Sequence, residues 1–82
     1  MAAVTGGNLT RHLAKRSFSL AGHRTSVALE PAFWAVLETV AARRGLSLGL
    51  LVAEVDAGRG GSHPPLASAL RLLALRDAHG DG

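Results

Sequence analysis

The sequence contains no cysteine and no tyrosine, and it has only one tryptophan and two phenylalanines among 82 residues. Without cysteine, neither a disulfide framework nor a thiolate zinc site can stabilise the fold. A domain of this length buries only about 60–65 % of the surface of its unfolded chain, and small domains commonly gain stability from disulfides, metals or association. We therefore expect a single small domain that associates with a second copy of itself.

Long hydrophobic runs are absent as well. No stretch approaches the roughly 20 apolar residues that a membrane-spanning helix needs, and the run at 48–53 is interrupted by Gly49. The first twenty residues are basic and free of acidic residues, which is typical of an organellar targeting peptide, but they lack the apolar segment of a secretory signal. We expect a cytoplasmic protein without a membrane partner; a cleaved targeting segment is the alternative.

Acidic residues are missing from the whole N-terminal part of the chain. Before Glu30 the sequence has four basic residues and no acidic one, namely Arg11, Lys15, Arg16 and Arg24. From Glu30 onward, five basic residues face six acidic ones, and the formal net charge of the whole chain is +3. A polyanionic partner would therefore be met by the N-terminal segment.

Patterns for metal binding and catalysis are missing too. The glycine-rich stretch at 58–61 lacks the Lys-Ser/Thr pair of a phosphate-binding loop, and Glu54 and Asp56 are two residues apart and cannot share a helix face. The histidines show no metal-ligand spacing, since they stand far apart at His12, His23, His63 and His79. We expect no enzyme activity, no cofactor and no metal.

Two short segments alternate between polar and apolar residues, as half-buried strands do. The first covers 16–20 and the second His23–Leu29, with Ala21 and Gly22 between them. In the second segment, Arg24, Ser26 and Ala28 share one face. Whether the two segments form a hairpin, or only the second is a strand, stays open at this point.

Three helices are expected after the strand region. Pro31 suits the first position of a helix, Phe33, Leu37, Val40 and Ala41 follow at helical spacing, and Gly45 suits the stop, which predicts a helix over 31–44. Ser47 is a good N-cap for a second helix that ends near Ala57. A third helix is expected over Leu66–Ala78. Residues 1–14 are expected to form a mobile arm and 79–82 a tail, so that the domain covers 15–78.

Several blocks of the chain, in order, resemble the ribbon-helix-helix proteins, and more narrowly a group of small uncharacterised bacterial members. The resemblance covers about 15–76. It rests on Lys-Arg-Ser at 15–17, on the strand region from Gly22-His-Arg-Thr-Ser to Pro31, on Phe33-Trp34, on Arg-Gly-Leu-Ser at 44–47, and on Ser-Ala-Leu-Arg at 68–71. It implies a mainly α-helical fold in an intertwined homodimer, in which one strand from each chain forms an intermolecular two-stranded antiparallel ribbon.

The resemblance also implies the roles of particular residues toward double-stranded DNA. The outward strand residues Arg24, Ser26 and Ala28 would contact bases, although Ala28 stands where the family usually has a polar residue. The amides of Ser47, Leu48 and Gly49, at the start of the second helix, would bind a phosphate, as helix N-termini do in general. Lys15 and Arg16 would add phosphate contacts that position the protein without reading sequence.

Three functions remain in consideration. The first is a sequence-specific transcriptional regulator, which binds DNA as a homodimer. The second is an antitoxin-like module, in which the C-terminal part would hold a toxin, although the apolar third helix is unlike a disordered partner-binding tail. The third is a protein-interaction adaptor that has lost DNA binding. Two departures from the family point to this alternative: Ala28, and Gly49, which stands where the family commonly has a polar side chain.

Overall fold

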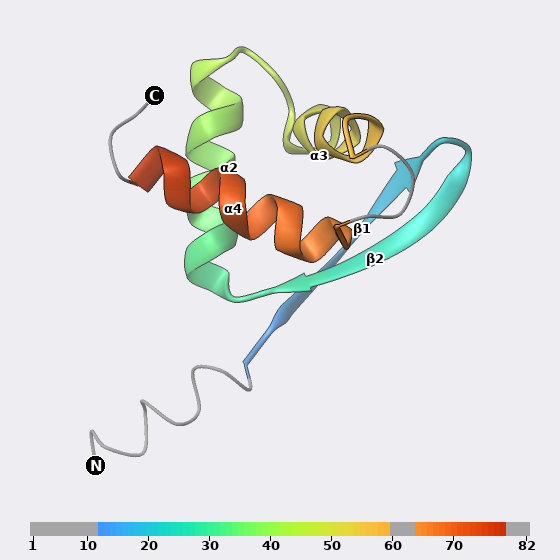
Figure 1. Ribbon diagram of the computed structural model, residues 1–82, viewed down its shortest axis with the longest axis horizontal. Helices are drawn as coiled ribbons and strands as arrows, with labels where there is room; N and C mark the ends of the chain where they lie inside the picture. The colour runs from blue at the N-terminus through green and yellow to red at the C-terminus, as the bar shows by residue number, and fades with distance from the viewer. Residues whose placement is uncertain (1–11, 60–63, 79–82) are drawn as a thin grey trace.

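The fold places three helices on one side of a two-stranded hairpin (Figure 1). The computed structural model describes residues 12–59 and 64–78. The elements in chain order are β1 (Ala14–Leu20), β2 (His23–Leu29), α2 (Pro31–Arg43), α3 (Leu48–Ala57) and α4 (Leu66–Ala78). Of the expected arm and tail, residues 1–11 and 79–82 lie outside the described residues, and Ala14, assigned to the arm, is the first residue of β1.

The question of the first strand is settled by the pairing of β1 with β2. The two strands are antiparallel, with a register that runs from Ala14 opposite Leu29 to Leu20 opposite His23. Only Ala21 and Gly22 connect them, and both have positive φ angles, of 51° and 83°. Two positive φ angles in a two-residue connection are what a type I′ turn requires, and this turn matches the twist of the strands that it joins.

The alternation of the strands sorts their side chains onto two faces. Val27 and Leu29 are buried beneath the helices, as is Leu20 of β1, while Thr25 and Phe18 are half-buried. The alternation predicted for the second segment is therefore confirmed.

The pairing of β1 with β2 within one chain differs from the expected ribbon between two chains. The sequence suggested that β2 would pair with the same strand of a second subunit, whereas in the structure one edge of β2 is already occupied by β1 of its own chain. A two-stranded ribbon thus exists in a single subunit. Pairing between subunits stays a prediction, and it would have to use another strand edge or displace β1.

Helix α2 begins and ends for the reasons that the sequence suggested. Pro31 stands at its first turn, and Gly45 adopts a positive φ of 70° just past its end. The amides of Gly45 and Leu46 donate to the carbonyls of Ala42 and Ala41, which closes the helix in a Schellman motif. The helix ends at Arg43, one residue earlier than predicted.

The buried stripe of α2 contains one residue that the predicted stripe omitted. Leu37, Val40 and Ala41 are buried as expected, but the fourth member is Trp34, which is only 1 % exposed. Phe33 packs at the margin of the core instead. The indole N–H of Trp34 donates to the carbonyl of Ala14 at 2.7 Å, so its polar atom is satisfied and the whole ring can be buried.

Helices α3 and α4 have the bounds that the sequence predicted. Leu51 and Val52 of α3 and Leu70 and Ala74 of α4 enter the same core as the residues of α2 and the hairpin. Leu50 of α3, in contrast, is 58 % exposed and lies outside the core. The core is therefore closed within one chain, because β1 and α4 supply the cover that a single strand and two helices would lack.

An ion pair joins α4 to the junction between β2 and α2. The guanidinium of Arg71 donates to both carboxylate oxygens of Glu30, at 3.0 and 3.2 Å, and stacks near the ring of Phe33. These hydrogen bonds lower the pKa of Glu30 below its ordinary value. A lowered carboxyl pKa means that the pair stabilises the fold at neutral pH and that this contribution is lost as the pH falls through the pKa of the folded state.

The turn of the hairpin offers a test of the fold. Ala21 adopts a left-handed conformation that costs an L-residue roughly 1–2 kcal/mol, whereas asparagine tolerates it well. We expect Ala21→Asn to raise the free energy of unfolding by about 0.5–1 kcal/mol in urea denaturation. Gly22→Ala, the neighbouring control, should lower it. Equal effects of the two substitutions would contradict the type I′ turn.

The docking of α4 can be tested with two leucines of the same helix. Leu70 is fully buried and Leu75 is 47 % exposed. We expect Leu70→Ala to reduce the free energy of unfolding by about 2–5 kcal/mol, because it leaves a cavity in the core. Leu75→Ala should change it by less than about 0.5 kcal/mol. Equally small effects, measured by chemical denaturation, would show that α4 is not part of the core.

Candidate nucleic-acid interface

The outer face of the hairpin points away from the helices. The register places the odd-numbered residues of β1 beside the even-numbered residues of β2, which makes a small polar surface on two adjacent strands. All of these side chains are exposed except Ala28, which is half-buried. We call this surface the outer hairpin face; it consists of Lys15, Ser17, Ser19, Arg24, Ser26 and Ala28.

The outer hairpin face carries positive charge and no acidic residue. Neither Lys15 nor Arg24 forms an ion pair within the described residues. Arg24 has only a long contact, 3.5 Å, from its guanidinium to the hydroxyl of Ser19 across the strand pair. The hydroxyls of Ser17 and Ser26 lie 3.3 Å apart in the same way. This face therefore presents two cations and several hydroxyls that can reorient toward a ligand.

The sequence predicted part of this face and missed the rest. Lys15, Arg24, Ser26 and Ala28, predicted from the resemblance, lie together on it. Ser17 and Ser19 were not singled out. The alternation of 16–20 contained the signal that places them there, but the sequence left open whether these residues form a strand at all.

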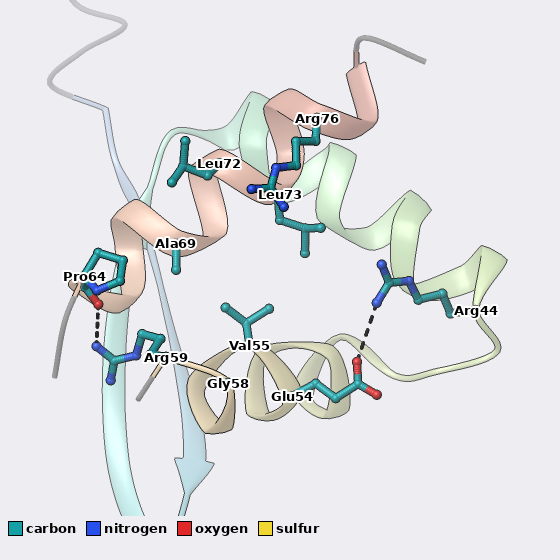
Figure 2. A pocket seen from close by; sticks show the side chains of 10 residues that line it. All are labelled: Arg44, Glu54, Val55, Gly58, Arg59, Pro64, Ala69, Leu72, Leu73 and Arg76. Atoms are coloured by element: carbon teal, nitrogen blue, oxygen red, sulfur yellow. Dashed lines mark hydrogen bonds and ion pairs between the residues drawn. The ribbon is translucent and has the colours of Figure 1, made fainter. Parts of the chain in front are cut away.

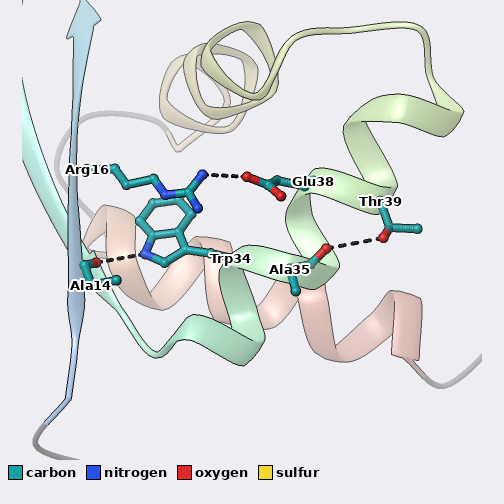
Figure 3. A network of polar contacts seen from close by, with 6 residues as sticks. All are labelled: Ala14, Arg16, Trp34, Ala35, Glu38 and Thr39. Atoms are coloured by element: carbon teal, nitrogen blue, oxygen red, sulfur yellow. Dashed lines mark hydrogen bonds and ion pairs between the residues drawn. The ribbon is translucent and has the colours of Figure 1, made fainter.

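Arg16 lies on the opposite face from the other predicted contacts. Its guanidinium stacks 5.1 Å from the centre of the Trp34 ring and donates to Glu38 at 2.6 Å (Figure 3). Residue 16 is opposite Val27 in the register, so its side chain leaves the sheet on the helix side. In this arrangement, the charge of Arg16 is balanced by Glu38 rather than displayed beside Lys15.

The N-terminus of α3 lies beside β1. Ser47 is the N-cap, and its hydroxyl accepts a hydrogen bond from the amide of Leu50 at 3.1 Å. A Cβ atom built on Gly49 would lie 4.0 Å from the ring of Phe18 in β1, an ordinary contact distance. The start of α3 thus lies near Phe18, on the helix-facing side of β1. The first amides of a helix lack partners within it, so this end favours an anion.

Other kinds of site find little support in the described residues. Within 12–59 and 64–78, no three histidine, aspartate or glutamate side chains come together as metal ligands would. Among the same residues, no helix is long and apolar enough to cross a membrane.

Comparison with known proteins identifies the domain. A family model described as a ribbon-helix-helix domain matches residues 13–78. The chain belongs to the ribbon-helix-helix family. This family has a DNA-binding fold rather than an enzyme fold, and its members typically bind DNA and dimerise. The match confirms the family predicted from the sequence.

A solved structure supports the same assignment. The ribbon-helix-helix domain is similar to an uncharacterized protein from Bordetella pertussis Tohama I, with a TM-score of 0.72 and 34 % sequence identity. The alignment covers 89 % of this chain and 64 % of that protein, so the present chain spans less than two thirds of the other's length. No match to this chain is found among the curated proteins.

The N-cap of this ribbon-helix-helix domain can be tested by substitution. Ser47→Ala removes the oxygen that accepts from Leu50 at the start of α3. We expect it to lower the free energy of unfolding by about 1 kcal/mol, measured by denaturant titration. Ser47→Asn, which keeps a capping oxygen, should stay within about 0.5 kcal/mol of the wild type. An alanine variant as stable as the wild type would contradict the capping role.

Proposed function

We propose that this protein is a sequence-specific DNA-binding transcriptional regulator that inserts its β1–β2 hairpin into the major groove. The observation that carries the proposal is the outer hairpin face, which is polar, positively charged and free of acidic residues. The membership of the chain in a family of DNA-binding regulators supports it.

The dimensions of the hairpin fit this role. A strand of seven residues is about 23 Å long, and the two strands lie about 4.8 Å apart. The major groove of B-DNA is about 12 Å wide and admits a two-stranded ribbon. A four-stranded sheet, made by joining two hairpins edge to edge, would span about 14 Å between its outer strands and would be too wide to enter. The hairpin of one chain is therefore the unit that we propose enters the groove.

We assign the residues on the outer hairpin face to two roles, contact with bases and contact with phosphates. Arg24 has the guanidinium that pairs with the O6 and N7 atoms of guanine, the most common specific contact in the major groove. The hydroxyl of Ser26 can donate or accept, and Ala28 can contact a thymine methyl. Lys15, at the far end of the face, is suited to a phosphate.

Phosphates along the flank of the groove would meet the N-terminus of α3. There the amides of Ser47, Leu48 and Gly49 provide donors beside β1, and Ser47 remains the N-cap. Arg16 can join them only by leaving Glu38 and the ring of Trp34. We therefore assign phosphate contact first to the α3 amides and Lys15.

We further propose a homodimer that recognises two half-sites and acts in the cytoplasm. The size of the chain and the habit of the family support association. The antitoxin-like alternative receives less support. A toxin would need α4 as an accessible partner-binding segment, whereas Leu70 and Ala74 of α4 are buried in the core of their own chain.

The proposal is tested by fluorescence anisotropy with pools of random-sequence duplex DNA, after light scattering has established the oligomeric state. We expect a recovered motif, bound more weakly as salt rises, with the logarithm of the affinity falling by about 0.9 for each phosphate neutralised. Arg24→Ala should weaken binding to that motif by about 1–3 kcal/mol and relax one base position.

Two control variants separate base reading from charge. Lys15→Ala should weaken binding to all sequences about equally and reduce the salt dependence by about one phosphate. Arg43→Ala should leave the affinity for DNA nearly unchanged, because Arg43 is on the helix side and is paired with Asp77. A folded wild-type protein that binds no DNA even at low salt would refute the proposal and favour the adaptor alternative.

A further inference from the structure

A groove of about 400 Å³ lies between α3 and α4, away from the outer hairpin face (Figure 2). Apolar side chains from both helices form its floor, and Leu72 on its α4 side is 51 % exposed. The apolar lining residues are Val55, Pro64, Ala69, Leu72 and Leu73. An exposed leucine beside a hollow of this kind offers apolar area that a partner can bury.

Three arginines surround this floor, and they differ in what already binds them. Arg59 donates hydrogen bonds to Asp56 and to the carbonyl of Pro64, so its guanidinium is already occupied and held at the side of the groove. Arg44 lies 3.5 Å from Glu54, a loose and exposed pair. Arg76 forms no ion pair within the described residues. The groove therefore has an apolar floor and an excess of positive charge on its rim.

We propose that this groove is a docking site for a short segment of a partner protein that combines carboxylates with apolar side chains. The apolar side chains would cover Leu72 and Val55, and the carboxylates would pair with Arg76 and Arg44. The guanidinium group suits this recognition, because its donors match the two oxygens of a carboxylate.

The described surface of a second copy of this chain is a poor occupant. Each of the five acidic side chains in the described residues already pairs with an arginine, so the described surface of another copy has no spare carboxylate for Arg76. A symmetric contact of groove with groove would place arginines against arginines. DNA is a poor occupant too, since a phosphate backbone would leave the apolar floor uncovered.

The test uses libraries of 12-residue peptides displayed on phage, selected against the full chain. We expect the selected peptides to contain both acidic and large apolar residues. For the synthetic peptides, Arg76→Glu and Leu72→Ser should each weaken binding by about tenfold or more, measured by anisotropy. Both residues are on the surface, so the variants should fold, and circular dichroism checks this.

Two variants serve as matched controls. Leu75→Ser removes a similarly exposed leucine of α4 that does not line the groove, and Arg24→Glu makes the same charge change on the outer hairpin face. Both should bind the peptides within about twofold of the wild type. Arg24→Glu should lose DNA binding while Arg76→Glu retains it, so failure of one proposal leaves the other standing.

Several results would overturn the docking proposal. These are selected peptides without acidic residues, peptide binding that neither Arg76→Glu nor Leu72→Ser weakens, or a wild-type dimer that Leu72→Ser dissociates in sedimentation experiments. A loss of DNA affinity in Arg76→Glu as large as that in Arg24→Glu would assign the groove to DNA and would equally refute a protein partner.

Discussion

The burial of Trp34 is the contact on which the arrangement of the hairpin depends. Its indole N–H holds the carbonyl of Ala14 at the start of β1, and its ring packs against Phe18 and beneath the guanidinium of Arg16. These contacts fix one face of β1 against α2. Because side chains alternate across a strand, fixing that face also decides that Lys15, Ser17 and Ser19 point outward. The core thereby determines what the outer surface of the hairpin displays.

The bounds of the helices could be predicted closely, because residues at the helix ends determine where each helix begins and stops. Pro31, Gly45 and Ser47 each act within one turn of chain, as an initiator, a stop and a cap, and each does so in the structure. The family could be predicted for a related reason, since the strand residues and the two helix junctions occur in a fixed order. What could not be read in the same way was the choice of Trp34 over Phe33 for the core, which depends on the reach of the indole N–H to another element.

The sequence alone did not decide whether a hairpin forms, because its turn lacks one of the residues that usually mark such a turn. The residues that readily adopt two positive φ angles are asparagine, aspartate and glycine, and here the first position is alanine. The same gap hid part of the candidate interface. Without a known β1, Ser17 and Ser19 had no assigned face, and Arg16 could not be separated from Lys15, although the register places them on opposite sides of the sheet.

The distribution of ion pairs links the two proposed surfaces. The described residues contain eight basic and five acidic side chains, and each acidic one pairs with a different arginine. Three cations are left over: Lys15 and Arg24 on the outer hairpin face and Arg76 beside the groove. The ion pairs on the helix side thus neutralise most of the charge there, although Arg44 beside the groove is only in a loose, exposed pair with Glu54. The positive charge that remains is concentrated at two separate places, one polar and one with an apolar floor.

A polar ribbon with unpaired cations suits the edges of base pairs and phosphates, whereas an apolar groove with an unpaired arginine suits a protein segment. The two surfaces share no residue, so they can be occupied independently.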